Sequence, residues 1–159
     1  MKFDSTYRGE FTGDIAVRCP KCQSHGRLFP GPERGNVFAS YRMVCGACGH
    51  NREWLPDAKT GGLSCPGTGP DLRGFGLSLW FQTPCHGEIL WAYNLAHIDF
   101  LETFIGAFLR ERRRDEKTGW ANSSLQSRLP PWMLKAGNRT DVLAGLQRLR
   151  EMSAESGRP

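Results

Sequence analysis

The chain has 159 residues, of which 39% are hydrophobic and 11% aromatic, with a formal net charge of +5 at pH 7. This length can bury one modest core, or one core with a smaller metal-organised unit beside it. No apolar run approaches the roughly 18 residues of a membrane span, and residues 1–4 do not start a signal peptide because they lack an apolar core. We therefore expect a cytoplasmic protein that does not enter a membrane.

Two cysteine pairs, Cys19–Cys22 and Cys45–Cys48, stand 22 residues apart. Two residues within a pair let one tight turn direct both sulfurs at a single ion, and two such knuckles complete a tetrahedron around Zn²⁺ with bonds of about 2.3 Å. A thioredoxin-like redox motif would need only one pair, at a strand-to-helix turn. Four thiolates leave no open coordination position, so the sequence predicts a structural zinc ion held by Cys19, Cys22, Cys45 and Cys48.

The surroundings of the two pairs favour short strands. Residues 15–18 and 42–44 lead into the knuckles, and residues 26–29 and 51–54 return from them. Over roughly residues 14–56 this pattern resembles a zinc ribbon, as in TFIIB-type and rubredoxin-like modules, within an otherwise unrecognised small bacterial-type protein. The resemblance implies two hairpins with the metal between their tips. Many ribbons bind nucleic acid or polymerase subunits and others only brace a fold, so the resemblance points to metal binding rather than to one function.

The middle of the chain predicts a second hairpin. Pro and Gly are dense in residues 30–36, which favours an exposed loop, and residues 65–70 have the composition of a turn-rich linker. Residues 76–82 and 88–93 are aromatic and aliphatic, and residues 83–87 between them suit a hairpin loop. Because the apolar runs are partly continuous, we expect these strands to be covered on both faces.

Helical spacing dominates the chain after the second hairpin. Apolar residues recur at helical intervals from 95 to 114, with Asn94 placed as the N-cap. Gly106 interrupts this helix at a propensity cost of about 1 kcal/mol, which close packing would explain. Two short helical turns separated at Pro130 are expected across residues 123–135.

A last helix is predicted near the carboxyl end. Residues 138–140 offer a cap, and Val142, Leu143, Leu146 and Leu149 form an apolar stripe over about 12 residues. Arg148 and Arg150 would end this helix, and residues 153–159 are expected to fray. The prediction for the whole chain is an α+β fold: a zinc-ribbon region over 1–64, then a β-hairpin with a helical part over 65–159, either separate or sharing one core.

Positive charge is concentrated in the last third. Residues 110–150 carry ten Lys or Arg against four Asp or Glu, a net of +6, whereas residues 65–109 have a net charge of −3. A basic surface with nearby Trp120 and Trp132 is typical of nucleic-acid binding, because cations contact phosphates and indoles stack on bases. The candidate residues are Arg112, Arg113, Arg114, Lys117, Arg128, Lys135 and Arg139. The plainer explanation is that arginines at a helix end only complement the helix dipole.

Two further functions would involve other residues. Cys65, Cys85, His86 and His97 could form a second metal site, although adjacent Cys and His residues point differently. Cysteine–histidine catalysis is the least favoured function, since there is no recognised catalytic motif and closeness in sequence does not place a base beside a nucleophile. We expect a non-catalytic, zinc-binding regulatory protein that binds nucleic acid, with a protein-interaction module as the alternative.

Overall fold

The computed structural model describes residues 11–31, 40–55, 69–72, 74–111 and 129–156, without the side chains of 108–111 and 156. In these residues the elements are β1 (Ile15–Arg18), β2 (His25–Pro30), β3 (Tyr41–Cys45), β4 (Asn51–Trp54), β5 (Asp71–Leu72), β6 (Leu77–Ser78), β7 (Phe81–Cys85), β8 (Glu88–Ala92), α1 (Leu95–Glu111), the 3-10 helices η3 (Pro131–Leu134) and η4 (Ala136–Asn138), and α2 (Arg139–Ser156). The predicted α+β class is confirmed. None of the described helices has the length and apolar character of a membrane span.

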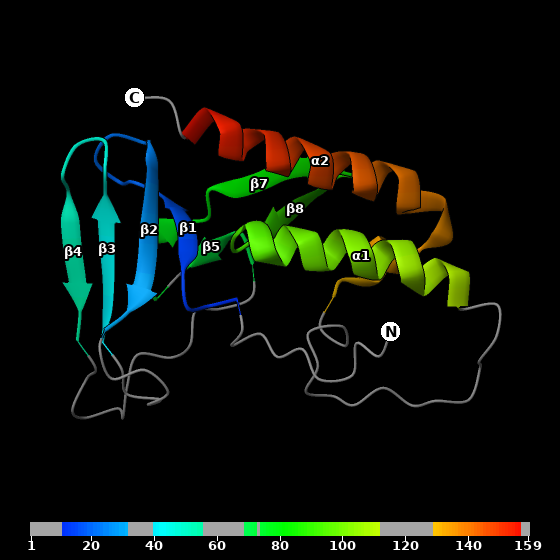
Figure 1. Cartoon of the computed structure of the whole chain (residues 1–159), viewed down its shortest axis with the longest axis horizontal. Helices are drawn as coiled ribbons and strands as arrows, with labels where there is room; N and C mark the ends of the chain where they lie inside the picture. Colours follow the sequence, from blue (N-terminus) through cyan, green and yellow to red (C-terminus); the bar gives the residue numbers. More distant parts are fainter. Residues whose placement is uncertain (1–10, 32–39, 56–68, 73, 112–128, 157–159) are drawn as a thin grey trace.

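The first four strands form one antiparallel sheet in the order β1-β2-β3-β4. Its register sets Ile15 opposite Leu28 and Leu28 opposite Met43, so apolar side chains of three strands share one face. The two predicted hairpins are present as β1–β2 and β3–β4, and pairing of β2 with β3 makes them one sheet. In Figure 1 this sheet stands at one end of the molecule.

A first hydrophobic core lies against the apolar face of this sheet. The short β5–β6 hairpin supplies Leu72, Phe75 and Leu77, and Phe75 meets Tyr41 and Trp54 edge-on. The buried members are Phe11, Ile15, Val17, Cys19, Leu28, Met43, Cys45, Leu72, Phe75, Leu77, Leu79 and Tyr93. This core therefore combines residues from both predicted regions, 1–64 and 65–159.

The remaining edge of β1 is bonded to the second half of the chain. The backbone N–H of Trp80 donates to the carbonyl of Ala16 at 2.9 Å, and the N–H of Ala16 donates to the carbonyl of Tyr93 at 2.8 Å. An isolated bridge also pairs Val17 with Leu79. These bonds fix the position of the four-stranded sheet relative to the β7–β8 hairpin.

The second hairpin differs from its prediction. The expected strand 76–82 is divided, because Leu77–Ser78 pairs with β5 while Phe81 begins β7. The expected loop 83–87 contracts to His86 and Gly87, whose φ angles of 54° and 72° suit the tight turn that matches the strand twist. Thr83 and Pro84 belong to the expected loop, yet both lie in β7, where proline is tolerated because β7 is an edge strand of this two-stranded sheet.

Two helices cover one face of the β7–β8 hairpin. Leu90 of β8 and Leu146 of α2 are fully buried there with Leu101 of α1, and α1 also packs against α2. Figure 1 shows the two helices side by side over the hairpin, extending away from the four-stranded sheet. On the opposite face Ile89 is 42% exposed and Pro84 is exposed, so the expectation that both faces are covered is wrong.

The first helix begins where the sequence predicted. The Oδ1 of Asn94 accepts a hydrogen bond from the N–H of His97 at 2.9 Å, which is N-cap geometry. The helix continues to Glu111, and residues 112–114 of the prediction lie outside the described residues. The sequence predicts close packing at Gly106, but a Cβ built there meets none of the described atoms within 4 Å. That expectation is therefore wrong.

The last helix is longer than predicted. Residues 139–156 are helical, so α2 has 18 residues rather than about 12, and residues 153–156 belong to it instead of fraying. Arg150 therefore lies within the helix, where it pairs with Asp99 and with Glu102, the latter at 2.6 Å, instead of ending it. Of the two short helical turns expected across 123–135, the second is confirmed as η3, with Pro131 in its first turn, whereas residues 123–128 lie outside the described residues.

Candidate metal centre

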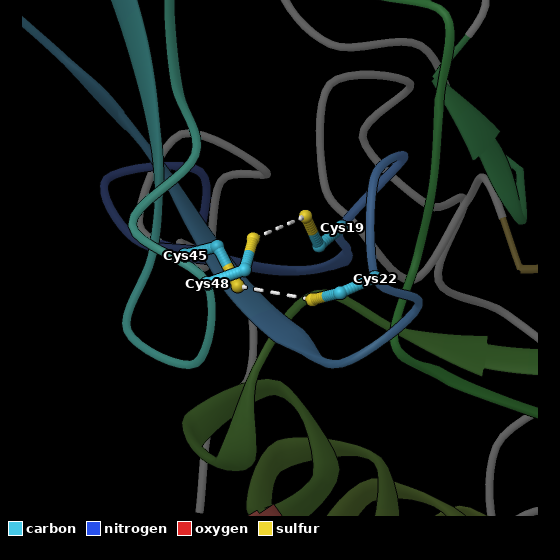
Figure 2. A group of neighbouring side chains, drawn as sticks. All are labelled: Cys19, Cys22, Cys45 and Cys48. Carbon is cyan, nitrogen blue, oxygen red and sulfur yellow. Dashed lines mark hydrogen bonds between the residues drawn. The ribbon is translucent and has the colours of Figure 1, made fainter.

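The four cysteines predicted as ligands lie together. The sulfurs of Cys19, Cys22, Cys45 and Cys48 are all within 4.8 Å of one another. Two contacts cross between the knuckles, Cys22 to Cys45 at 3.6 Å and Cys19 to Cys48 at 3.8 Å, as Figure 2 shows. A tetrahedron with Zn–S bonds of about 2.3 Å has edges of about 3.8 Å, so the sulfurs are close to the spacing that zinc requires. The cluster can hold a metal ion, and its ligand set supports a zinc-binding role.

The two knuckles have the same backbone hydrogen bonds. In the first, the N–H of Gln23 donates to the carbonyl of Cys19 and the N–H of Cys19 donates to the carbonyl of Ser24; Gly49, Cys45 and His50 repeat both bonds in the second. Both turns need a left-handed residue after the second cysteine. Gly49 adopts the left-handed conformation with φ of 73°. Gln23 adopts it with φ of 64°, although a residue with a side chain is less favourable there.

Sequence reasoning missed Gln23 and Ser24, which complete the first knuckle. Hydrogen bonds with the side chain and then the backbone of Ser24 lower the pKa of Cys22 to about 6, so a thiolate is present there at neutral pH. Gln23 and Gly49 each directly follow the second cysteine of a C-x-x-C pair. This shared position is the feature of the sequence that could have indicated the same turn in both knuckles.

Crowding of the sulfurs affects their ionisation. A backbone hydrogen bond involving His50 lowers the pKa of Cys48, but desolvation and three neighbouring sulfurs outweigh it and raise the pKa to about 11. Neighbouring thiolates repel one another, so a bound divalent cation is needed before all four ionise. This behaviour suits a closed thiolate site that releases protons when it takes up its metal.

The residues of the predicted second metal site have other contacts. The Nε2 of His86 lies 2.7 Å from a carboxylate oxygen of Asp141, and the Cys85 thiol donates to the Asp141 carbonyl at 3.7 Å. His97 is buried, with its ring stacked between Phe11 and Tyr93. Cys65 lies outside the described residues, within which the first cluster alone brings three or more such ligands together. The second site stays a prediction.

His97 and Cys85 are poorly placed for proton transfer or nucleophilic attack. The Nδ1 of His97 accepts a hydrogen bond from the backbone N–H of Tyr93 at 3.1 Å, and burial lowers the pKa of the ring to about 3. Burial also raises the pKa of the Cys85 thiol, which disfavours the reactive thiolate.

Most of the predicted nucleic-acid residues lie outside the described part of the chain: Arg112, Arg113, Arg114, Lys117 and Arg128. Lys135 is exposed. Arg139 is half-buried and donates to the carbonyl of Gly106 at 3.4 Å, while Arg148 donates to the carbonyl of Pro84 at the same distance. Several cations of α2 therefore contact other parts of the fold.

No protein-family model, curated protein or solved structure matches the chain. The fold and the site define an α+β protein with a four-cysteine cluster in its N-terminal sheet.

Proposed function

We propose that the chain is a zinc-binding, non-catalytic regulatory protein whose metal ion holds the N-terminal sheet together and whose basic C-terminal third binds nucleic acid. The observation that carries the proposal is the convergence of four cysteine sulfurs within 4.8 Å. Two ligands, Cys19 and Cys45, belong to the first core, so the metal would stabilise the packing of both hairpins. Zinc would serve as a structural cross-link, because four thiolates exclude a reactive water.

Metal content of the purified protein tests the first part. We expect about one equivalent of zinc, lost in Cys22→Ser and retained in Cys85→Ser. Cys85 is the matched control because it is also a described cysteine but contacts Asp141 rather than the cluster. Two equivalents that fall to one in Cys85→Ser would instead establish the second metal site, and protein without bound metal would contradict the proposal.

Net charge supports the second part. The +6 of residues 110–150 is the largest local excess of charge in the chain. Binding of fluorescent single-stranded DNA and RNA at low salt should weaken as salt rises. The substitution Arg112/Arg113/Arg114→Ala should reduce the dependence of log affinity on log salt by about two to three.

A charge-matched variant controls this experiment. Lys21, Arg42 and Arg52 are exposed cations of the N-terminal sheet region, and their joint replacement by Ala removes the same charge. We expect this variant to bind more tightly than Arg112/Arg113/Arg114→Ala. Equal losses would place the contact elsewhere, and undetectable binding at low salt would rule out nucleic acid as the partner.

A protein-interaction module is the second candidate. The observation that favours it is a set of exposed large apolar side chains, with Val44 38%, Leu55 70%, Ile89 42% and Leu95 42% exposed. Exposed apolar residues favour contacts that resist salt. A protein partner retained in pull-downs at high salt, and lost in Ile89→Ser, would support this function over nucleic-acid binding.

A further inference from the structure

Solvent reaches the four cysteines of the metal centre unequally. Cys19 and Cys45, the first cysteine of each knuckle, are buried, whereas Cys22 and Cys48, the second of each, are exposed. The two close sulfur contacts each join an exposed sulfur to a buried one: Cys22 to Cys45 and Cys48 to Cys19. Figure 2 shows that both contacts run between the knuckles. Each accessible sulfur thus has a shielded sulfur of the other knuckle as its neighbour.

We infer that this centre is a site of reversible oxidation by peroxides, in which disulfides Cys22–Cys45 and Cys19–Cys48 form across the knuckles and the metal ion leaves. The inference rests on the zinc centre proposed above. It goes further, because it assigns different roles to the exposed and the buried cysteines, the exposed ones reacting first and the buried ones resolving the product.

The chemistry balances within each pair. The thiolate of Cys22 attacks one peroxide oxygen, the O–O bond breaks, and a sulfenic acid and a hydroxide form. The thiolate of Cys45 then attacks the sulfenic sulfur; an S–S bond forms, the S–O bond breaks and a second hydroxide leaves. Each sulfur gives up one electron and the peroxide gains two. Cys48 and Cys19 consume a second peroxide in the same way, and Zn²⁺ is released because the protein's thiolate ligands are gone.

The position of these disulfides has a structural consequence. Each one joins the β1–β2 knuckle to the β3–β4 knuckle, as the metal does. The oxidised protein therefore keeps its two hairpins linked without metal. A disulfide within one knuckle would leave the hairpins unlinked at that end.

Zinc release is the first measurement. The wild-type protein, shown beforehand to contain zinc, is titrated with hydrogen peroxide while a chromogenic chelator reports free zinc. We expect about one zinc per two peroxides consumed, and recovery of zinc binding after a thiol reductant and zinc are added. The double variant Cys65→Ser/Cys85→Ser should behave in the same way, because the inference assigns the oxidation to the four cysteines of the cluster.

Disulfide connectivity is the second measurement. Cleavage after Lys and Arg separates Cys19 in residues 19–21, Cys22 in residues 22–27, and Cys45 with Cys48 in residues 43–52. Disulfides across the knuckles link both small peptides to 43–52. Disulfides within the knuckles link 19–21 to 22–27 and leave 43–52 without a partner peptide.

These two measurements test the oxidation site and the proposed zinc centre separately. Protein purified without metal contradicts the proposed zinc centre. Protein that contains zinc but keeps it under peroxide, forms disulfides within the knuckles, or does not recover with reductant overturns only the oxidation site. Release of zinc with both small peptides linked to 43–52 supports it when fragmentation between Cys45 and Cys48 finds Cys22 on Cys45 and Cys19 on Cys48, whereas the reverse pairing overturns the assigned roles.

Discussion

Asn94 joins the start of α1 to the segment before β1. Its Oδ1 caps the helix, while its Nδ2 donates to the carbonyls of Phe11 and Asp14, both at 2.8 Å. We expect Asn94→Ala to lower the free energy of unfolding by about 2–3 kcal/mol, since a cap and two further hydrogen bonds are lost. Chemical denaturation of the zinc-loaded protein measures this change.

Asn94→Asp is the matched control for this residue. It keeps the oxygen that caps the helix but sets a carboxylate oxygen against the carbonyls of Phe11 and Asp14, so both donated bonds are lost and the variant should be less stable than wild type. Wild-type stability in Asn94→Asp would show that the bonds to Phe11 and Asp14 contribute nothing.

His97 should make stability depend on pH. Because burial lowers its folded pKa to about 3, from an ordinary value near 6.5, the unfolded chain binds a proton that the folded protein does not. The contribution of neutral His97 to the free energy of unfolding is therefore complete above about pH 6.5 and decreases as pH falls toward the folded pKa. Between pH 7 and 5.5 we expect it to remove about 1 kcal/mol from the free energy of unfolding.

The difference between wild type and His97→Phe isolates this effect from acid release of the metal. Loss of the acceptor for Tyr93 N–H makes the variant less stable at pH 7, but the gap between the two proteins should narrow at pH 5.5. A gap that stays constant with pH would mean that His97 does not titrate as its burial implies.

At the scale of elements, two helix glycines have opposite surroundings. Among the residues that the structure describes, a Cβ at Gly106 of α1 meets nothing within 4 Å, whereas one at Gly145 of α2 lies 2.6 Å from the Cδ2 of the buried Leu90. We expect Gly106→Ala to stabilise the protein by about 1 kcal/mol through helix propensity. Gly145→Ala should destabilise it by about 1 kcal/mol or more, because overpacking exceeds that gain. Thermal unfolding measures both, and a Gly145→Ala variant that is more stable than wild type would contradict the packing at α2.

How far the elements could be predicted depends on whether their cause is local. The knuckles could be predicted from the cysteine spacing, and the start of α1 from Asn94, because each of these features depends only on residues a few positions away in the sequence. The β7 boundary was missed because Pro84 suggests a loop until its pairing with Ile89 is known. The close approach at Gly145 depends on Leu90, 55 positions away in sequence, and no pattern in the sequence indicates that contact.

The site was predictable to the same extent. Four ligands could be chosen from their spacing alone, and the sulfur distances agree with that choice. The roles of Cys85 and His97 could not be predicted from the sequence. Adjacency in sequence does not show that the Cys85 thiol contacts the Asp141 carbonyl or that the ring of His97 stacks on Phe11. Burial and partners come from contacts between distant segments.

For the molecule as a whole, the two cores should respond differently to metal removal. Cys19 and Cys45 are buried in the first core, while the second, between β7–β8 and the two helices, contains neither. Chelation under reducing conditions should therefore increase amide hydrogen exchange in residues 15–30 and 41–54 more than in 95–105 and 142–150. Adding zinc should restore the protection. A uniform increase across both cores would mean that they unfold as one unit.

The four-stranded sheet ends differently on its two sides. Beside β1 the backbone groups of Ala16 are bonded to Trp80 and Tyr93, so no further strand can add there. The other border is β4, which is four residues long and places Asn51, Arg52 and Glu53 at the surface. Short, charged border strands discourage edge-to-edge pairing between copies. The sheet is therefore protected from growing into aggregates, on one side by its own chain and on the other by charge.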